Sequence, residues 1–463
     1  GHCFLPQPEL VDLTVQLLTS SEHEAEPEAV RAVIEQMGQD KELIVETAEG
    51  GMSLCYQPSF FYTEQHLAKL ILQHLSRPVV VDLARVKDWI ARFTSRQGLS
   101  LSPQQQQAVE IAASSRVMVL TGGPGTGKTF CTRTIAALWK AMGKKIAACS
   151  PTGRAAQRLS EVTGMEAKTL HRLLEFDPAT RGFKRDLENL LPYQALVVDE
   201  ASMLDLFLAH SLIKAIPPEA QLLIVGDIAQ LPSVGPGNIL KDLINSQQIP
   251  VIRLTQVFRQ AASSAIVRVA HQINQGQYPT LEPISAAPHS DCLWHNGGSQ
   301  PEHGVQAICE LIQDFIPRLG FSPAADVQVL SPMTRGVVGT RNLNQVLQQL
   351  INPPSPDKAE ITRVGNTLRV GDKVIQLKND YQREVFNGDL GIVASIDFDE
   401  QEVLLQFDER SVIYDYADLN EVALAWSISI HKSQGSEYPV VILPLYMQHS
   451  LMLSRNLVYT GLT

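Results

Sequence analysis

Apolar and polar residues along the chain follow two alternating patterns, one typical of buried strands and one typical of helices. From about residue 100 to 260, short apolar runs alternate with segments of helical spacing, and the runs read VMVL, IAAC, ALVVD, LLIVG and VIRL. This alternation is typical of a parallel, doubly wound α/β sheet. A second set of runs, DVQVLSP, LAWSISI and PVVILPL, appears after residue 325. The pattern predicts two α/β domains, at residues 97–260 and 261–463.

Three other regions depart from this pattern. Residues 1–96 are mainly helical with two short strands around a glycine turn, which fits a winged-helix-like domain and equally a plain helical packing domain. Residues 360–418, approximately, carry short strands, an NGD turn and a DFDEQE hairpin tip, and we expect a small antiparallel barrel inserted into the second α/β domain. Residues 173–186 read as a hairpin with phenylalanines on both sides of a DPATRG turn.

Composition narrows the class of protein. A chain of 463 residues with 44% hydrophobic residues is long enough for about three domains. It has no apolar run near the roughly 18 residues of a membrane span, so we expect no membrane partner. Six scattered cysteines without a C-x-x-C pair indicate reduced thiols in a cytoplasmic protein. Because residue 1 is glycine and no signal peptide is evident, we expect the sequence to begin inside a longer chain.

The net charge of −11 is unevenly distributed along the chain. Residues 1–60 hold 11 acidic and 2 basic residues, whereas the rest is close to neutral. Residues 153–185 contain seven basic residues against four acidic ones. Nucleic-acid binding depends on local positive surfaces and not on the total charge. The charge therefore does not exclude a nucleic-acid partner.

The stretch LTGGPGTGKT fits the P-loop pattern G-x-x-x-x-G-K-[ST] between a buried strand and a helix start. Its glycines let backbone N–H groups converge on phosphate oxygens at a positive helix end. We expect Lys128 to reach the β- and γ-phosphates of ATP and the Thr129 hydroxyl to ligate Mg²⁺. The predicted nucleotide-binding residues here are Gly122, Gly123, Pro124, Gly125, Thr126, Gly127, Lys128 and Thr129.

Four further residues complete the predicted chemistry of ATP hydrolysis. Asp199 and Glu200 follow the apolar strand ALVV, where an aspartate holds Mg²⁺ and a glutamate deprotonates the attacking water. Gln230, in GDIAQLPSVGPGN, is placed to sense the γ-phosphate. Arg259, in VFRQ, is placed to stabilise transition-state charge from across a cleft. Gln105, in LSPQQQQAV, can donate to and accept from the edge of an adenine, although the adjacent glutamines leave the register uncertain by one.

The order of these motifs resembles superfamily 1 DNA helicases, and within them the RecD-like group of the 5′→3′ class. The motifs are GGPGTGKT, SPTGRAAQRL, VVDEASM, GDIAQLPSVGPG, VFRQ and HKSQGSEY, and the resemblance covers residues 97–463. It implies two RecA-like domains, an SH3-like barrel and a hairpin that acts as a pin. It also implies an ATP-dependent DNA helicase that acts in repair or recombination on single-stranded DNA and duplex junctions, with protein partners from those processes.

The resemblance also implies the residues that grip DNA. In the first domain these are Pro151, Thr152, Gly153, Arg154, Thr169, His171 and Arg172. In the second domain they are His431, Lys432, Ser433 and Gln434, while Gly435 and Glu437 of the same loop contact the nucleotide. Phosphate contacts of this kind fix register without reading sequence.

One departure from the family pattern leaves alternatives open. The family's last motif continues YTGLT with an arginine, and this sequence ends at Thr463. Either the protein is an ATP-gated fragment that binds single-stranded DNA with impaired hydrolysis, or the printed sequence omits a tail. A P-loop ATPase that remodels protein complexes is a further alternative, and DNA-stimulated ATP turnover would distinguish the helicase from it.

Overall fold

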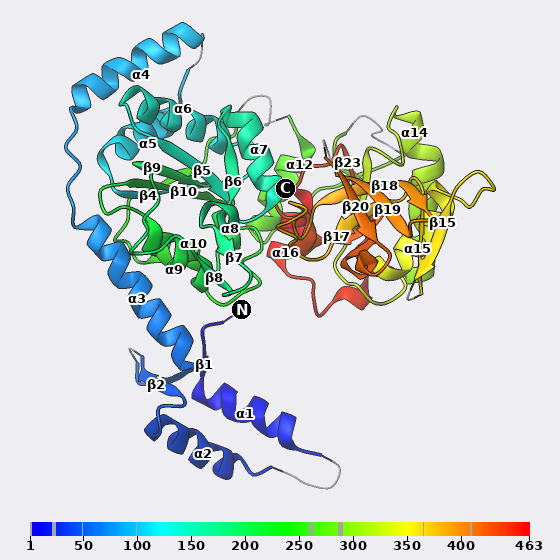
Figure 1. Ribbon diagram of the computed structural model, residues 1–463, viewed down its shortest axis with the longest axis horizontal. Coiled ribbons are helices and arrows are strands. Elements are labelled where there is room, and N and C mark those ends of the chain that lie inside the picture. The colour runs from blue at the N-terminus through cyan, green and yellow to red at the C-terminus, as the bar shows by residue number, and fades with distance from the viewer. Residues whose placement is uncertain are drawn as a thin grey trace.

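A computed structural model of the chain describes residues 2–20, 25–48, 50–98, 100–258, 263–285, 290–363, 365–407 and 410–463. The amino-terminal elements project from one side of the molecule, and the two α/β domains with the barrel form the rest (Figure 1). No helix among these residues is long and apolar enough to cross a membrane. All six cysteines are free thiols.

The amino-terminal region is a small antiparallel sheet, ordered β1-β3-β2, with helices on it. Its elements are β1 (Phe4–Pro6), α1 (Gln7–Leu18), α2 (Pro27–Gln39), β2 (Ile44–Thr47), β3 (Ser53–Tyr56) and α3 (Pro58–Leu75). The next helix, α4 (Leu83–Gln97), packs on α5 and α6 of the first α/β domain. Helix α3 leads back to the first α/β domain and contacts α9 there, with the rings of Phe60 and Phe207 5.6 Å apart (Figure 1).

The first α/β domain contains a parallel sheet ordered β11-β4-β10-β9-β5-β6. Its strands are β4 (Val117–Gly122), β5 (Ile146–Ser150), β6 (Ala167–Thr169), β9 (Ala195–Val198), β10 (Gln221–Gly226) and β11 (Val251–Leu254). Its helices are α5 (Pro103–Ser114), α6 (Lys128–Ala141), α7 (Gly153–Thr163), α8 (Leu170–Leu173), η1 (Ala201–Met203), α9 (Leu206–Ala215) and α10 (Ile239–Asn245). Helices cover both faces, so the central strands β4, β9 and β10 are buried on both sides and almost wholly apolar.

A short antiparallel hairpin leaves this domain after α8. It consists of β7 (Phe176–Asp177) and β8 (Gly182–Phe183), with Phe176 opposite Phe183. The hairpin lies where the sequence pattern predicts it.

The second α/β domain has a smaller parallel sheet, ordered β22-β14-β23. Its strands are β14 (Val327–Ser331), β22 (Ser427–Ser429) and β23 (Val440–Ile442), with a separate pair, β12 (Glu282–Pro283) and β13 (Leu293–Trp294). Its helices are α12 (Ala265–Asn274), α13 (Pro301–Glu310), η2 (Leu311–Phe315), α14 (Ile316–Arg318), α15 (Thr340–Ile351), η4 (Ile430–Ser433), η5 (Met447–His449) and α16 (Arg455–Leu462). The domain limits 1–96, 97–260 and 261–463 remain predictions.

An antiparallel sheet ordered β20-β19-β18-β17-β21 is inserted between α15 and β22. Its strands are β17 (Lys373–Gln376), β18 (Leu390–Asp397), β19 (Glu402–Phe407), β20 (Arg410–Asp415) and β21 (Val422–Leu424), preceded by the hairpin β15 (Glu360–Arg363) and β16 (Asn366–Arg369) and including η3 (Asp418–Glu421). We call this region the barrel. Val374, Val403 and Tyr414 are fully buried at its centre.

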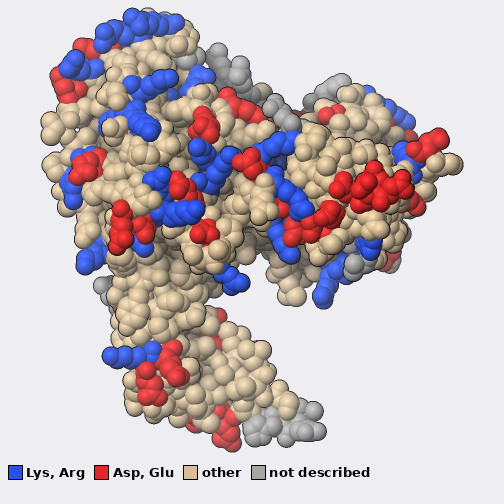
Figure 2. Space-filling model, in the orientation of Figure 1, with Lys and Arg blue, Asp and Glu red and all other residues tan. Residues whose placement is uncertain are grey.

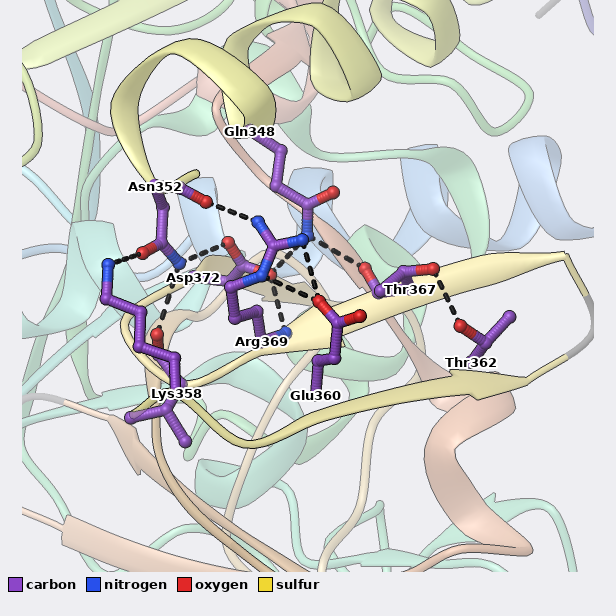
Figure 3. A network of polar contacts seen from close by, with 9 residues as sticks. Gln348, Asn352, Lys358, Glu360, Thr362, Thr367, Arg369 and Asp372 are labelled. Atoms are coloured by element: carbon purple, nitrogen blue, oxygen red, sulfur yellow. Dashed lines mark hydrogen bonds and ion pairs between the residues drawn. The ribbon is translucent and has the colours of Figure 1, made fainter. Parts of the chain in front are cut away.

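A buried polar network fixes the barrel to α15 (Figure 3). The Asp372 carboxylate is fully buried and accepts from Gln348 at 2.5 Å, from Asn352 at 2.8 Å and from the Arg369 N–H at 2.7 Å. Burial raises the pKa of Asp372, and these donors oppose that shift. Arg369 in turn pairs with Glu360 at 2.8 Å. Because α15 belongs to the second α/β domain, the network attaches the barrel to that domain.

Candidate nucleotide site and interdomain cleft

The P-loop joins the end of β4 to the start of α6 in a left-handed backbone conformation. Gly125 and Gly127 have φ of 71° and 80°, which only glycine adopts without strain, and Gly127 is the residue before the helix. The Lys128 ammonium donates to the carbonyls of Gly122 and Gly123 at 2.6 and 3.0 Å. Thr126 donates to the same Gly123 carbonyl at 2.8 Å. These bonds hold the loop as a compact cradle with its lysine folded over it.

Two carboxylates lie beside this cradle at the end of β9. Glu200 has a left-handed backbone with φ of 52°, which is uncommon for glutamate and is typical of functional sites. Burial raises the pKa of Glu200 to about 7, the neighbouring Asp199 adds to the shift, and Lys128 opposes it. Burial also raises the pKa of Asp199, although the Glu200 N–H donates to its Oδ1 at 2.9 Å. A carboxyl group that titrates near neutral pH is suited to act as a general base.

The loop after β10 connects the nucleotide side of the first domain to α16 of the second. The Tyr459 hydroxyl donates to Asp227 Oδ2 at 2.7 Å, and the Leu231 N–H donates to Thr460 Oγ1 at 2.9 Å. Gln230 accepts at its backbone carbonyl from Asn456 at 3.2 Å. Its side-chain Oε1 is buried and has no hydrogen-bond partner among the described residues.

Gln105 is fully buried behind the P-loop. A side chain on Gly127 would lie 2.6 Å from Gln105 Nε2 and 2.9 Å from the Phe258 ring. Gln105 Oε1 accepts from the Ser102 N–H at 3.0 Å in a capping box, while its Nε2 has no partner in the described part of the chain. The Nε2 of this amide is therefore free to donate to a base. The neighbouring Gln104 is instead bonded to Thr255 at 3.0 Å.

The loop that follows β22 contacts the first α/β domain near the start of α7. A side chain on Gly435 would lie 2.9 Å from Ala155 Cβ and 3.1 Å from Thr152 Oγ1. Glu437 forms an ion pair with Arg158 at 3.0 Å. Arg154 donates to the Tyr438 hydroxyl at 3.0 Å, with its guanidinium over that ring. Gly435 and Glu437 thus lie against α7.

The predicted DNA contacts in this loop differ in exposure. Ser433 and Gln434 are buried, where Ser433 donates to the Ile430 carbonyl at 2.9 Å and Gln434 to the Leu231 carbonyl at 3.0 Å. His431 and Lys432 are half-buried, and burial lowers the pKa of both.

The predicted DNA contacts of the first domain lie where it meets the barrel. Thr152 caps α7 and Thr169 caps α8 through their hydroxyls. Gly153 lies beside Asp389, whose Oδ1 is 2.9 Å from the position of a side chain there. Arg172 forms an ion pair with Glu384 of the barrel at 2.8 Å. Figure 2 shows basic side chains along this boundary and an acidic patch over the barrel side.

Aromatic rings connect the hairpin to the barrel. His171 lies 5.6 Å from the ring of Phe176, and burial lowers the pKa of His171. Phe176 lies 5.4 Å from Phe183 and 5.4 Å from Tyr381 of the barrel. The hairpin and the barrel therefore form one wall beside the start of α7.

Three protein families match the chain in the same order as its domains. Residues 100–290 match the family described as "AAA domain", residues 343–407 the "ATP-dependent RecD-like DNA helicase SH3 domain", and residues 424–463 the "UvrD-like helicase C-terminal domain". The chain is 30% identical over 403 residues to the RecBCD enzyme subunit RecD of Mycolicibacterium smegmatis, with 78% of this chain and 69% of that protein covered. The chain belongs to the RecD-like family of superfamily 1 helicases.

Two other proteins are similar to this RecD-like chain. The ATP-dependent RecD2 DNA helicase of Deinococcus radiodurans is 37% identical over 467 residues, covering all of this chain but 62% of the relative. The chain thus spans less than two thirds of that relative's length. The crystal structure of Bacteroides Pif1 bound to single-stranded DNA gives a TM-score of 0.47 at 18% identity, over 78% of this chain and 89% of that one.

For this RecD-like chain, the predicted fold class of two RecA-like domains with an SH3-like insertion is confirmed. The structure gathers Lys128, Asp199, Glu200 and Gln105 at the P-loop. Arg259 lies outside the described residues. The assigned roles of all predicted site residues remain predictions.

Four residues at this site were missed by sequence reasoning. Phe258 directly precedes Arg259 in the motif VFRQ, and this position could have indicated that Phe258 belongs to the site. Asp227 and Tyr459 each stood inside a recognised motif, GDIAQLP and YTGLT. His271 stood in no recognised motif, and its position beside Gly123 comes from the fold alone.

Proposed function

We propose that the protein is an ATP-dependent DNA helicase that moves 5′→3′ along single-stranded DNA and unwinds duplex DNA in repair or recombination. One observation carries the proposal: buried hydrogen bonds from Tyr459 to Asp227 and from Leu231 to Thr460 join the P-loop side of the first domain to the second. A change at the nucleotide therefore has a direct route to the second domain. The relative named "ATP-dependent RecD2 DNA helicase" supports the same activity.

The P-loop residues fit a nucleoside triphosphate. The left-handed glycines Gly125 and Gly127 turn the backbone around the cradle, and the Lys128 ammonium already rests on it. Thr129 and Asp199 would hold Mg²⁺ through oxygen atoms, which this cation prefers. Bound there, the ion supplies positive charge to the β- and γ-phosphates. The unpaired Gln105 N–H and the Phe258 ring would face the base.

Glu200 would take the proton of the attacking water. Its pKa of about 7 places it between carboxylate and carboxylic acid at neutral pH, so it both accepts a proton and releases it readily. Gln230 has a buried, unpaired Oε1 that would accept from the same water. Arg259 would add positive charge from the second side of the cleft, as the resemblance implies.

Single-stranded DNA and duplex junctions are the partners in this proposal, with proteins of recombination or repair as further partners. The start of α7, the loop 431–437 and the wall of hairpin and barrel together would hold the strand. Their basic groups, among them Arg154, Arg158 and Arg172, have phosphate-binding chemistry. The free cysteines fit a reducing compartment, and the proposal includes a cytoplasmic location.

Unwinding of matched duplexes that carry a 5′ or a 3′ single-stranded tail tests the proposal. The expected result is ATP-dependent separation of the duplex with the 5′ tail and little separation of the other, with no activity in Lys128→Ala. DNA-stimulated ATP hydrolysis is measured on the same preparations. Binding of DNA without hydrolysis would favour the ATP-gated binding fragment, and hydrolysis that ignores DNA would favour a protein-remodelling ATPase.

A further inference from the structure

A histidine of the second α/β domain lies directly against the P-loop. His271 is on α12, and its Cε1 and Nε2 are 3.3 and 3.9 Å from the position that a side chain on Gly123 would take. Nε2 is buried and has no hydrogen-bond partner in the part of the chain that the structure describes. A buried ring nitrogen without a partner carries a desolvation cost and calls for an explanation.

The part of the cradle that His271 faces is its terminal-phosphate end. Lys128, the residue that reaches the β- and γ-phosphates in P-loop proteins, bonds to the carbonyls of Gly122 and Gly123. Gly123 therefore marks where the last phosphate of a triphosphate would lie. His271 reaches this place from the opposite domain.

A second polar group lies equally close but is already engaged. The Tyr459 hydroxyl is also 3.3 Å from the side-chain position on Gly123, and it donates to Asp227 at 2.7 Å. Of these two second-domain groups, His271 is the one whose polar atom remains unpaired. Its ring nitrogen can donate a hydrogen bond to an anionic oxygen.

We propose that His271 binds the terminal phosphate of a nucleoside triphosphate and so distinguishes the triphosphate from the diphosphate for the second domain. The inference rests on the proposed nucleotide site. A diphosphate ends one phosphate short and offers no oxygen at Gly123, so His271 contributes nothing to its affinity. Helix α12 contacts α16, which carries Tyr459, so the same contact reaches the interdomain hydrogen bonds.

Equilibrium binding of a non-hydrolysable ATP analogue and of ADP, each with Mg²⁺, tests this role. His271→Ala is expected to weaken binding of the analogue about tenfold, because one hydrogen bond to a charged group is lost. It is expected to change the affinity for ADP less than twofold. His271→Gln keeps an N–H donor and is expected to recover part of the loss. The matched control is His303→Ala, which removes an exposed histidine of the same domain and is expected to alter neither affinity.

The outcomes separate this inference from the proposed function. Equal weakening of the analogue and ADP, or no weakening of either, would overturn the role of His271 while leaving the nucleotide site intact. If the unaltered protein binds neither nucleotide, or if Lys128→Ala binds the analogue as well as the unaltered protein does, the nucleotide site itself is wrong. Thermal unfolding of each variant confirms that a loss of binding is not a loss of fold.

Discussion

Replacing Tyr459 by phenylalanine removes one hydroxyl from the buried seam between the two α/β domains. Tyr459 is 1% exposed and its acceptor Asp227 is 4% exposed. Burial and the contact with Asp227 raise the pKa of Tyr459, so the hydroxyl stays protonated and donates. Phenylalanine fills the same volume without leaving a cavity. The loss is therefore one hydrogen bond to a charged group, about 1.5–3 kcal/mol.

Hydrogen exchange of the Leu231 backbone N–H would report the loss of this hydrogen bond. This N–H donates to Thr460 Oγ1 one residue from Tyr459, so its hydrogen exchange follows opening of the seam and not global unfolding. Because 1.4 kcal/mol is about a factor of ten, Tyr459→Phe is expected to lower its protection roughly ten- to hundredfold. The Val119 amide, bonded to Pro250 in the first domain, should keep its protection.

Tyr278→Phe is the matched control, because it removes the same hydroxyl from a tyrosine that is fully exposed. It should leave both amides unchanged. A change of less than twofold at Leu231 in Tyr459→Phe would refute the inference that this hydrogen bond holds the domains together. An equal fall at Val119 would show global destabilisation instead.

Three other perturbations test the site. Lys128→Ala is expected to reduce ATP hydrolysis at least a thousandfold, and near-normal turnover would remove the P-loop assignment. Burial raises the pKa of Glu200 to about 7, and the carboxylate form is the active base, so kcat should rise from pH 6 to 8. Glu200→Gln should lose most of the activity and also this rise with pH. A flat pH profile in the unaltered protein would contradict the role of Glu200 as the base. Glu384→Gln removes the ion pairs of Glu384 with Arg172 and with Arg410 and should tighten single-stranded DNA binding up to about fivefold, with Glu400→Gln as the equal-charge control. The gain should vanish in an Arg172→Ala background, and its persistence there would show that Arg172 is not the group that binds DNA.

Local patterns predicted five of the six strands of the first sheet, because each of these five is a short apolar run between segments of helical spacing. The apolar runs correspond to β4, β5, β9 and β10, which are almost wholly buried, and to the edge strand β11, whose Arg253 is exposed. Strand β6 was missed because Ala167–Thr169 is only three residues long and contains a lysine. A strand this short shows no periodicity from which to predict it.

The partners of the site residues could not be predicted, because they are set by contacts between distant segments. Asp227 and Tyr459 are 232 residues apart in the chain, and Arg154 and Tyr438 are 284 apart. The glutamine motif shows a different limit. Ser102 and Gln105 also fit the S-x-x-Q capping box, and the structure uses the Gln105 carbonyl for that purpose. Gln105 thus fits both the glutamine motif and the capping box, and the sequence analysis named only the glutamine motif.

The contacts between the two α/β domains fall into two kinds with different physical responses. At the nucleotide side they are buried hydrogen bonds, Tyr459 to Asp227 and Leu231 to Thr460, which salt screens little. At the α7 side the ion pair of Arg158 with Glu437 is exposed, so salt or a polyanion competes for the arginine.

Residues of the loop 431–437 take part in the contacts on both sides. Gln434 donates to Leu231 on the nucleotide side, and Gly435 lies against Ala155 on the other. If DNA displaces Glu437 from Arg158 as proposed, the loop 431–437 would lose one contact with the first domain, while Gln434 still joins it to the loop after β10. We therefore expect DNA binding at α7 and nucleotide binding at the P-loop to change each other's free energy through this shared loop.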